Sequence, residues 1–496
     1  MMTFDEYEKH DGLGLADLVA TGEVTAAELT ETAIARIEEV NPRLNAVVHP
    51  MFDYARKAAA RDDLRGPFAG VPFLLKDLLS ELAGVPHSSG SRFYRDFRPE
   101  QNSELTNRYL AAGVVVAGKT NTPEFGLLPT TEPEVWGPTQ NPWDPTRTAG
   151  GSSGGSSAAV ASGMVPLASG GDGGGSIRIP CSCCGLFGLK PTRGRTPTGP
   201  KFAEDWHGFS VEHVLTRTVR DSAAMLDAIC GHYPGDTHFQ PRPDVPFCEE
   251  VTRSVGKLRI AWSGRPFVPA TVHPEVLRGL EETVSLLADL GHEVTERAPV
   301  IDGALFAKSY LVVIGAHTWA AIGDGERAMG RKARRRDFES KTWLAHLMGG
   351  AFTAGEYVAA VRALQRIVRP VHELAEEVDV LLQPTVSQPP PRLGFLDKGG
   401  FAGLLERFAG HLAPKALLRA DATLDQASAE SFAFVPWTPI YNVTGQPSMS
   451  VPLCTSTDGL PMGMMFTGRL GDEATLLRLA GQVEEARPWW NKRPPL

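Results

Sequence analysis

The sequence predicts an α/β fold on three observations. Short apolar segments with the character of buried strands alternate with amphipathic segments of helical period. The composition, 42% apolar and 22% charged over 496 residues, is that of a globular protein with enough material for a large core. No internal repeat or low-complexity tail interrupts the alternation. Length alone would allow about three domains of ~150 residues each.

The predicted elements follow one another along this alternation. Thr25 and Glu28 form a capping-box pattern at the start of a helix, which Asn41 and Pro42 are expected to end. Asp472 is expected to cap the last helix. Between them, strands are predicted at residues 71–75, 114–117, 258–262, 379–382 and 463–466, and helices at residues 104–112 and 274–291.

Charge and composition limit the partners of the chain. The net charge of −9 argues against a nucleic-acid partner, and the basic run at residues 331–336 is expected to be a solvated helix face. No segment approaches the ~18 uninterrupted apolar residues of a membrane span, and the N-terminal residues lack the apolar core of a signal peptide. Six cysteines without paired C-x-x-C motifs predict buried free thiols, no metal site and a reducing cytoplasm.

The stretch at residues 150–180 is dense in glycine and serine, and apolar runs inside it distinguish it from a flexible linker. Successive N–H groups of Gly173, Gly174 and Gly175, just before Ser176, can converge on one oxygen, as an oxyanion hole requires. A phosphate cradle is the rival interpretation, but it would continue into Gly-Lys-Ser or Gly-Lys-Thr, which neither glycine-rich segment does. The end of the stretch, residues 176–180, is predicted to begin a strand.

A single lysine, Lys76, closes the apolar segment at residues 71–75. A serine hydroxyl becomes a nucleophile only when a base takes its proton, and no histidine of this chain lies in a hydrolase or metalloprotease motif. Lysine can act as that base once burial has lowered its pKa from about 10.4. The alternative is a lysine at a strand end that points to water.

Taken together, these segments resemble the amidase signature family, the Ser–cisSer–Lys amide hydrolases. The resemblance covers most of the chain and rests on motifs in a fixed order. These motifs occupy residues 70–77, 118–121, 141–142, 150–155, 175–178, 184–192, 381–385, 442–447 and 459–463.

The resemblance implies one domain over residues 1–496, built on a twisted mixed β-sheet flanked by α-helices. It also implies a role for each residue of the site. Lys76 corresponds to the catalytic lysine, Ser176 to the nucleophile and Ser152 to a bridging serine that follows a cis peptide bond. The oxyanion hole corresponds to the N–H groups of Gly173, Gly174, Gly175 and Ser176. No cofactor is implied. The catalytic core is expected at about residues 65–220, and the region at about 300–435 either shapes the pocket or packs at the periphery.

Within the family, the chain is most similar to the branch of 6-aminohexanoate cyclic-dimer hydrolases, aryl-acylamidases and urethane-cleaving amidases. The aromatic residues expected near the pocket predict a neutral, largely apolar or aryl amide, carbamate or ester as substrate. We expect a monomer or homodimer in the cytoplasm. Two alternatives stay open, which are the amidase subunit of a glutamyl-tRNA amidotransferase-like complex and a catalytically silent binding subunit. The residues expected to line the pocket are Leu127, Leu128, Pro129, Thr130, Phe202, Trp206 and Phe209.

Overall fold

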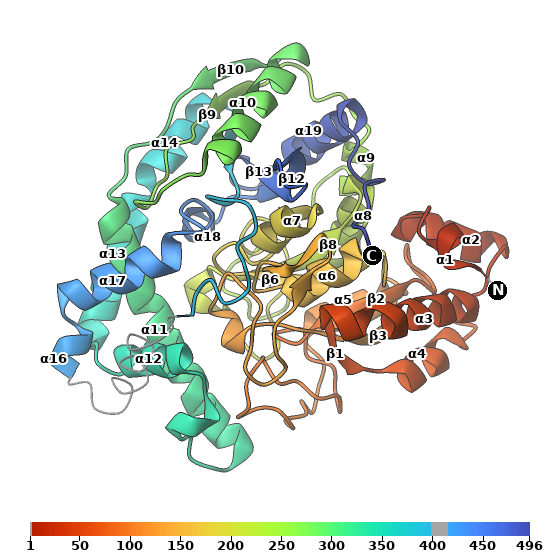
Figure 1. Cartoon of the computed structure of the whole chain (residues 1–496), viewed down its shortest axis with the longest axis horizontal. Coiled ribbons are helices and arrows are strands. Elements are labelled where there is room, and N and C mark those ends of the chain that lie inside the picture. Colours follow the sequence, from red (N-terminus) through yellow and green to blue (C-terminus); the bar gives the residue numbers. More distant parts are fainter. Residues whose placement is uncertain (1, 398–414) are drawn as a thin grey trace.

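One mixed β-sheet runs through the molecule and helices flank it (Figure 1). The computed structural model describes residues 2–397 and 415–496. Within them, eleven strands join in the order β1-β3-β2-β6-β8-β7-β12-β13-β11-β9-β10. These strands are β1 (Val47–Pro50), β2 (Pro72–Lys76), β3 (Val115–Thr120), β6 (Leu167–Asp172), β7 (Phe187–Lys190), β8 (Val211–Thr216), β9 (Arg259–Trp262), β10 (Glu293–Glu296), β11 (Val380–Pro384), β12 (Ser448–Thr455) and β13 (Pro461–Thr467). The predicted α/β fold with a mixed sheet is thereby confirmed.

The helices occupy the segments between the strands and much of the second half of the chain. In the first half they are α1 (Phe4–Tyr7), α2 (Gly12–Thr21), α3 (Ala26–Leu44), α4 (Phe52–Ala59), α5 (Glu104–Ala111), α6 (Gly154–Ala161), α7 (Arg178–Cys184) and α8 (Val219–Ile229). In the second half they are α9 (Phe247–Glu250), α10 (Pro274–Asp289), α11 (Gly303–Met329), α12 (Ser340–Gly349), α13 (Ala354–Ile367), α14 (Arg369–Glu377), α16 (Lys415–Leu418), α17 (Asp421–Phe432), α18 (Ile440–Thr444) and α19 (Glu473–Ala486). A separate hairpin pairs β4 (Gln140–Asn141) with β5 (Asp144–Thr148).

The predicted strands and helices correspond to β2, β3, β9, β11, β13, α5, α10 and α19, with shifts of a few residues at their ends. The apolar run of β2 is buried along its whole length, as a strand covered on both faces requires. Asp472 caps α19 as expected, because its side chain accepts a hydrogen bond from the N–H of Thr475.

The centre of the sheet brings the ends of three strands together. Strands β2 and β6 are parallel, so their C-terminal residues, Lys76 and Asp172, lie at the same edge. Strand β8 pairs antiparallel with β6, and its first residues therefore reach the same edge, where Glu212 pairs with Gly171. In a parallel sheet this edge is where ligands generally bind. The sheet thus collects polar side chains from three separate parts of the sequence.

Two of the predicted boundaries are wrong. Helix α3 continues through Pro42 to Leu44 and ends at Asn45, whose φ of 51° lies in the left-handed region. The segment predicted to begin a strand at residues 176–180 instead enters helix α7. Asp172 explains this second difference, because its carboxylate accepts the N–H of Ile177 at 3.2 Å and so satisfies a donor at the start of the helix.

The basic run at residues 331–336 is not a helix face. Helix α11 ends before it, and the run forms a loop with a short 3₁₀ turn at Arg335–Asp337. Two of its charges have acidic partners nearby, with Arg331 on Asp337 at 2.9 Å and Lys332 on Glu326 of α11 at 2.7 Å.

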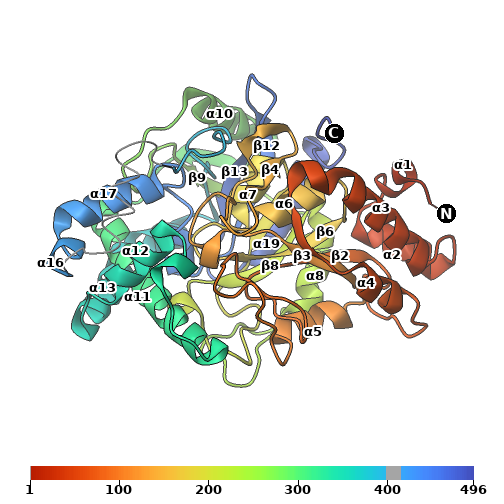
Figure 2. The same cartoon turned by 60° about the horizontal axis from the view of Figure 1, so that its bottom comes forward.

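The helices from α11 to α17 gather on one side of the molecule, opposite α1 to α4 (Figures 1 and 2). Helix α11 packs against α12, α13 and α17, and residues of its own line the cavity described below. By length and composition α11 passes as a membrane span, but 56% of its most apolar window is buried, as in a core helix. Residues 398–414, which belong to the predicted variable region, lie outside the described residues.

Close packing between α6 and β3 makes Gly155 sensitive to any side chain. A Cβ added at Gly155 would lie 2.3 Å from the backbone N of Asn121 and 2.6 Å from the carbonyl of Ala46. We expect Gly155→Ala to lower the free energy of unfolding by about 2 kcal/mol or more, because backbone atoms cannot move aside cheaply. Chemical denaturation of the purified variant measures the loss.

Gly355→Ala is the matched control, since it makes the same change in the open helix α13. The nearest atom to a Cβ there is Thr353 Oγ1 at 3.9 Å. This variant is expected to gain about 0.5–1 kcal/mol, because alanine has less conformational entropy to lose in a helix. Equal stability of the two variants would contradict the packing described for Gly155.

Candidate active site

A buried lysine and a serine form the centre of the site. The side chain of Lys76 is 1% exposed, and its Nζ donates to Ser152 Oγ at 2.7 Å and to the carbonyl of Gly171 at 3.4 Å. Burial lowers the pKa of Lys76 to about 7, and the carboxyls of Glu212 and Asp172 oppose that shift. The lysine does not point to water. A large fraction of it is neutral near pH 7, and a neutral amine can accept a proton.

The loop that carries Ser152 is held from behind by residues 130 and 131. The peptide bond between Gly151 and Ser152 is cis, as the resemblance implies. Thr131 Oγ1 donates to the carbonyl of Gly150 at 2.9 Å. A Cβ added at Gly151 would lie 2.7 Å from the backbone of Thr130, so only glycine allows this approach. The loop therefore has little freedom to move Ser152 away from the lysine.

The carboxylate of Asp172 organises the next loop, which carries Ser176. It accepts hydrogen bonds from Gly175 N at 2.7 Å, from Arg178 Nε and Nη2 at 2.9 Å, and from Asn442 Nδ2 at 2.8 Å. Burial by itself would raise the pKa of Asp172, but Arg178 and Asn442 hold that pKa well below its usual range. The aspartate therefore stays charged and keeps the loop in place.

Two hydroxyl groups fix the direction of the peptide groups in this loop. Tyr310 of α11 donates to the carbonyl of Gly173 at 2.6 Å, and Thr438 donates to that of Gly174 at 2.7 Å. A carbonyl and the following N–H point in opposite directions, so Tyr310 orients the N–H of Gly174. The region at 300–435 thus contributes to the site and does not only pack at the periphery.

The structure narrows the predicted set of oxyanion donors. The N–H of Gly175 binds Asp172 and is not free to hold an oxyanion. The N–H groups of Gly173, Gly174 and Ser176 have no acceptor among residues 2–397 and 415–496. The prediction missed this difference because the glycine run alone does not show which amide turns toward the preceding aspartate.

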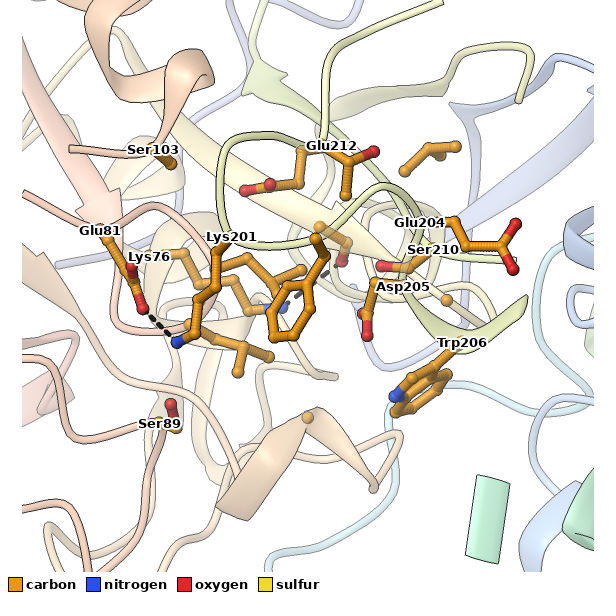
Figure 3. Close-up of a pocket in the computed structure, with 18 of the residues that line it drawn as sticks. Lys76, Glu81, Ser89, Ser103, Lys201, Glu204, Asp205, Trp206, Ser210 and Glu212 are labelled. Carbon is orange, nitrogen blue, oxygen red and sulfur yellow. Dashed lines mark hydrogen bonds and ion pairs between the residues drawn. The ribbon is translucent and has the colours of Figure 1, made fainter. Parts of the chain in front are cut away.

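Lys76, Ser152 and Ser176 line one cavity of about 170 Å³. Figure 3 shows this cavity with the side chains that surround it. Ser176 is 9% exposed and lies on the wall of this cavity. The structure thus brings together three residues from β2 and two separate loops, and Gly173 lies beside them.

Only some of the residues predicted to line the pocket line this cavity. Phe202 and Trp206 line it, and the Trp206 ring covers Gly173, where an added Cβ would lie 2.8 Å from the ring. Phe209 is 3% exposed and lies in the core, with its ring 6.0 Å from that of Tyr310. The other predicted residues that do not line the cavity are Leu127, Leu128, Pro129 and Thr130.

Two of these residues, Leu127 and Thr130, do not reach the cavity because they pack elsewhere. Leu127 packs against the apolar core, and Thr130 is buried behind the loop of Ser152. The neighbouring Phe125 and Gly126 line the cavity instead. An added Cβ at Gly126 would lie 3.1 Å from Ser152 Oγ, so this segment meets the serine through backbone rather than through the predicted side chains.

The cavity also holds charged groups that the sequence did not single out. Lys201 and Glu81 form an ion pair at 2.6 Å (Figure 3). Burial raises the pKa of Glu212 to about 8 and that of Asp205 to about 6. These residues occur at no regular spacing, and only the strand order brings Glu212 to the same edge of the sheet as the lysine.

The cysteines contribute packing. Cys181, Cys183 and Cys184 are free and buried, as predicted, whereas Cys248 is exposed. Burial raises the pKa of all three thiols, that of Cys184 to about 12, so they stay protonated. Over residues 2–397 and 415–496, no group of three histidine, cysteine or acidic side chains could hold a metal ion.

A buried lysine bonded to a serine, beside free amides and a second serine, is an arrangement that can act on a carbonyl group. Comparisons with known proteins identify the class of enzyme. The family model described as Amidase matches residues 28–477. The chain belongs to this family, the amidase signature enzymes, and it is an amidase.

Individual relatives cover nearly the whole chain. The 6-aminohexanoate-cyclic-dimer hydrolase of Pseudomonas sp. (strain NK87) is 37% identical over 494 residues, which are 98% of this chain and 96% of the relative. A solved structure of 6-aminohexanoate cyclic dimer hydrolase aligns with a TM-score of 0.88 at 35% identity, covering 98% of this chain and 99% of that one. The structure of a bacterial aryl acylamidase aligns with a TM-score of 0.83 at 26% identity, covering 98% of this chain and 96% of that one.

The hydrogen bond from Tyr310 to Gly173 gives a first test of the site. We expect Tyr310→Phe to lower kcat by about tenfold, because the peptide that carries the N–H of Gly174 loses its fixed direction. Tyr357→Phe is the matched control, since its hydroxyl makes only 3.4 Å contacts, with His207 and His317. Steady-state kinetics on any accepted amide measures the effect, and equal kcat values for the two variants would contradict it.

Proposed function

We propose that this amidase cleaves its substrate through a covalent acyl-enzyme on Ser176. The observation that carries the proposal is the hydrogen bond between Lys76 and Ser152, buried in the same cavity as Ser176. Neutral Lys76 takes a proton from Ser152, which takes one from Ser176 as its Oγ attacks the amide carbonyl. The N–H groups of Gly173, Gly174 and Ser176 are the candidates for holding the oxyanion.

The second half of the cycle reverses the proton path. Lys76, now an ammonium, returns its proton through Ser152 to the leaving nitrogen, and the C–N bond breaks. Water then attacks the ester of Ser176 by the same relay, and the acid is released. The chain's own groups carry every proton in this scheme, the attacking water supplies the proton that returns to Ser176, and no cofactor is used.

The substrate we propose is a neutral, largely apolar or aryl amide, and carbamates and esters are accepted as well. Phe202 and Trp206 support this class because flat aromatic walls favour apolar groups. Amides, carbamates and esters all pass through a tetrahedral oxyanion, which the same donors can hold. The relatives named above act, by their names, on a cyclic amide and on aryl amides. We place the enzyme in the cytoplasm as a monomer or homodimer without a nucleic-acid or membrane partner.

Substitutions at the three catalytic positions should follow a definite order. Ser176→Ala is expected to lower kcat by about 10⁴-fold or more, Lys76→Ala nearly as much, and Ser152→Ala less, because water can replace a bridging hydroxyl. Purified variants with unchanged circular dichroism provide the measurement. Activity of Ser176→Ala within tenfold of the wild type would overturn the assignment of the nucleophile.

The pH dependence of kcat/KM should follow the ionisation of Lys76. Because the base must be neutral, kcat/KM is expected to rise with pH through a value near 7 and to level off above pH 8. The buried His213 is a useful control, since burial lowers its pKa to about 3 and it binds Ser222 away from the cavity. An acid limb that disappeared on replacing a single histidine would rule out Lys76 as the base.

A small substrate panel tests the substrate class. We expect a p-nitroanilide and an aryl carbamate to give higher kcat/KM than a small primary amide such as glutamine, because apolar surface enters the aromatic-walled cavity. Glutamine as clearly the best substrate would instead support a role as the amidase subunit of a glutamyl-tRNA amidotransferase-like complex. Failure of a fluorophosphonate probe to label the pure protein would indicate a catalytically silent subunit.

A further inference from the structure

His87 lines the cavity, and the proposed reaction gives it no role. Its ring nitrogen Nδ1 lies 2.6 Å from the amine of Lys119, which is fully buried in the last part of β3. That amine lies 3.6 Å from the carboxylate of Asp77. Burial alone would raise the pKa of Asp77, but a hydrogen bond from His49 and the charge of Lys119 hold that pKa below its usual value. The carboxylate is therefore charged, and Lys119 is its ammonium partner.

The ammonium of Lys119 determines which nitrogen of the His87 ring carries the hydrogen. An ammonium has only N–H donors, so Nδ1 of His87 must accept this hydrogen bond. Burial and the charge of Lys119 lower the pKa of His87 well below its usual value, so the ring is neutral and has a single N–H. That N–H is therefore at Nε2.

The Nε2–H group of His87 has no acceptor in the described part of the chain, and the atom keeps accessible surface. Because the residue is 4% exposed and lines the cavity, this surface faces the cavity. Two residues further along, the hydroxyl of Ser89 also has no partner among residues 2–397 and 415–496. Figure 3 shows Ser89 on the cavity wall, below the ion pair of Lys201 and Glu81. Two polar groups of one loop are thus available to a ligand.

The loop that carries both residues is held firmly in place. The two carboxylate oxygens of Asp77 accept the N–H of Ser88 at 3.1 Å, and Trp136 donates to Ser88 Oγ at 2.9 Å. The N–H of Phe125 donates to the carbonyl of Ser89 at 2.8 Å. A ligand that binds here meets groups that are already in position, which lowers the entropic cost of a hydrogen bond.

The cavity wall also includes apolar rings, those of Phe97, Phe125 and Phe202. A purely apolar ligand that packed on them and displaced water from His87 would leave the Nε2–H group without a partner, which is unfavourable. A ligand that places an acceptor oxygen there would satisfy the donor. Sites of this kind discriminate strongly against an analogue that lacks the hydrogen-bonding group.

We propose that His87, with Ser89 beside it, forms a polar subsite that binds a neutral acceptor oxygen of the substrate, such as a second carbonyl group away from the amide that is cleaved. The inference rests on the proposed function, because it takes this cavity as the place where the amide binds. It adds one acceptor to the neutral, largely apolar substrate proposed above. His87 moves no proton in this role.

Two substitutions of His87 separate binding from a purely structural role. His87→Asn keeps an acceptor near Nδ1 for Lys119 but has no group at the position of Nε2. His87→Gln places an amide N–H near Nε2 but leaves Lys119 without its acceptor at Nδ1. The subsite requires the glutamine variant to keep the wild-type ligand preference and the asparagine variant to lose it. A ring that only supports Lys119 predicts the reverse.

The measurement is calorimetric binding to Ser176→Ala, which under the proposed function binds amides without cleaving them. The ligands are heptananilide and derivatives that carry a keto group at successive carbons of the acyl chain or an acetyl group on the aniline ring. We expect the best derivative to bind about tenfold more tightly than heptananilide. This advantage should remain when His87→Gln is added and fall to about twofold or less when His87→Asn is added.

Equal dissociation constants for heptananilide and every derivative would overturn the subsite, and so would an advantage that survives in His87→Asn. If the His87 variants do not fold, Ser89→Ala replaces them, because it leaves the bond between His87 and Lys119 intact. It should lower the advantage by about twofold or more, and an unchanged advantage would again overturn the proposal. Hydrolysis of the anilides by Ser176→Ala would instead contradict the proposed nucleophile, and KM values of the same variants would then decide the subsite.

Discussion

The site depends on one buried interaction, the ion pair between Asp172 and Arg178. It joins the end of strand β6 to the first turn of helix α7, and Asn442 ties both to the segment that precedes β12. A buried pair of this kind contributes little net stability, but loss of either partner would leave an uncompensated charge in the core. Its consequence here is geometric, since it fixes the loop that carries Ser176 and directs the N–H of Gly175 away from the cavity.

The same burial that fixes this loop gives the lysine its chemistry. Lys76 lies at the end of a strand covered on both faces, so water cannot stabilise its charged form. Its pKa of about 7 brings an ordinary strand residue into the range where it can take and return a proton. Its amine then meets the hydroxyl of Ser152 and the carbonyl of Gly171 on the neighbouring strand β6. Fold and chemistry are therefore linked through the position of β2 between β3 and β6.

The sequence allowed the fold class to be predicted, because apolar runs mark the buried strands. The three polar residues that the family resemblance implied line one cavity, and their catalytic roles stay a prediction. Features that depend on distant partners could not be predicted in this way. The hydrogen bond from Tyr310 and the position of Glu212 arise from contacts between separate segments. The bond from the Gly175 amide to Asp172 is local, but the glycine run does not show which amide turns toward the aspartate. Phe209 was placed in the pocket because aromatic composition does not distinguish a cavity wall from a core.

The central claim is that Ser176 carries the acyl group, and the mass of the intact protein tests it most directly. Incubation with a slowly turned-over aryl ester or carbamate should add the mass of one acyl group, and peptide mapping should place it on Ser176. The adduct should be absent from Ser176→Ala. An adduct on Ser153 or Ser157, or an active wild-type enzyme that forms no adduct on Ser176 under rapid quenching, would contradict the account.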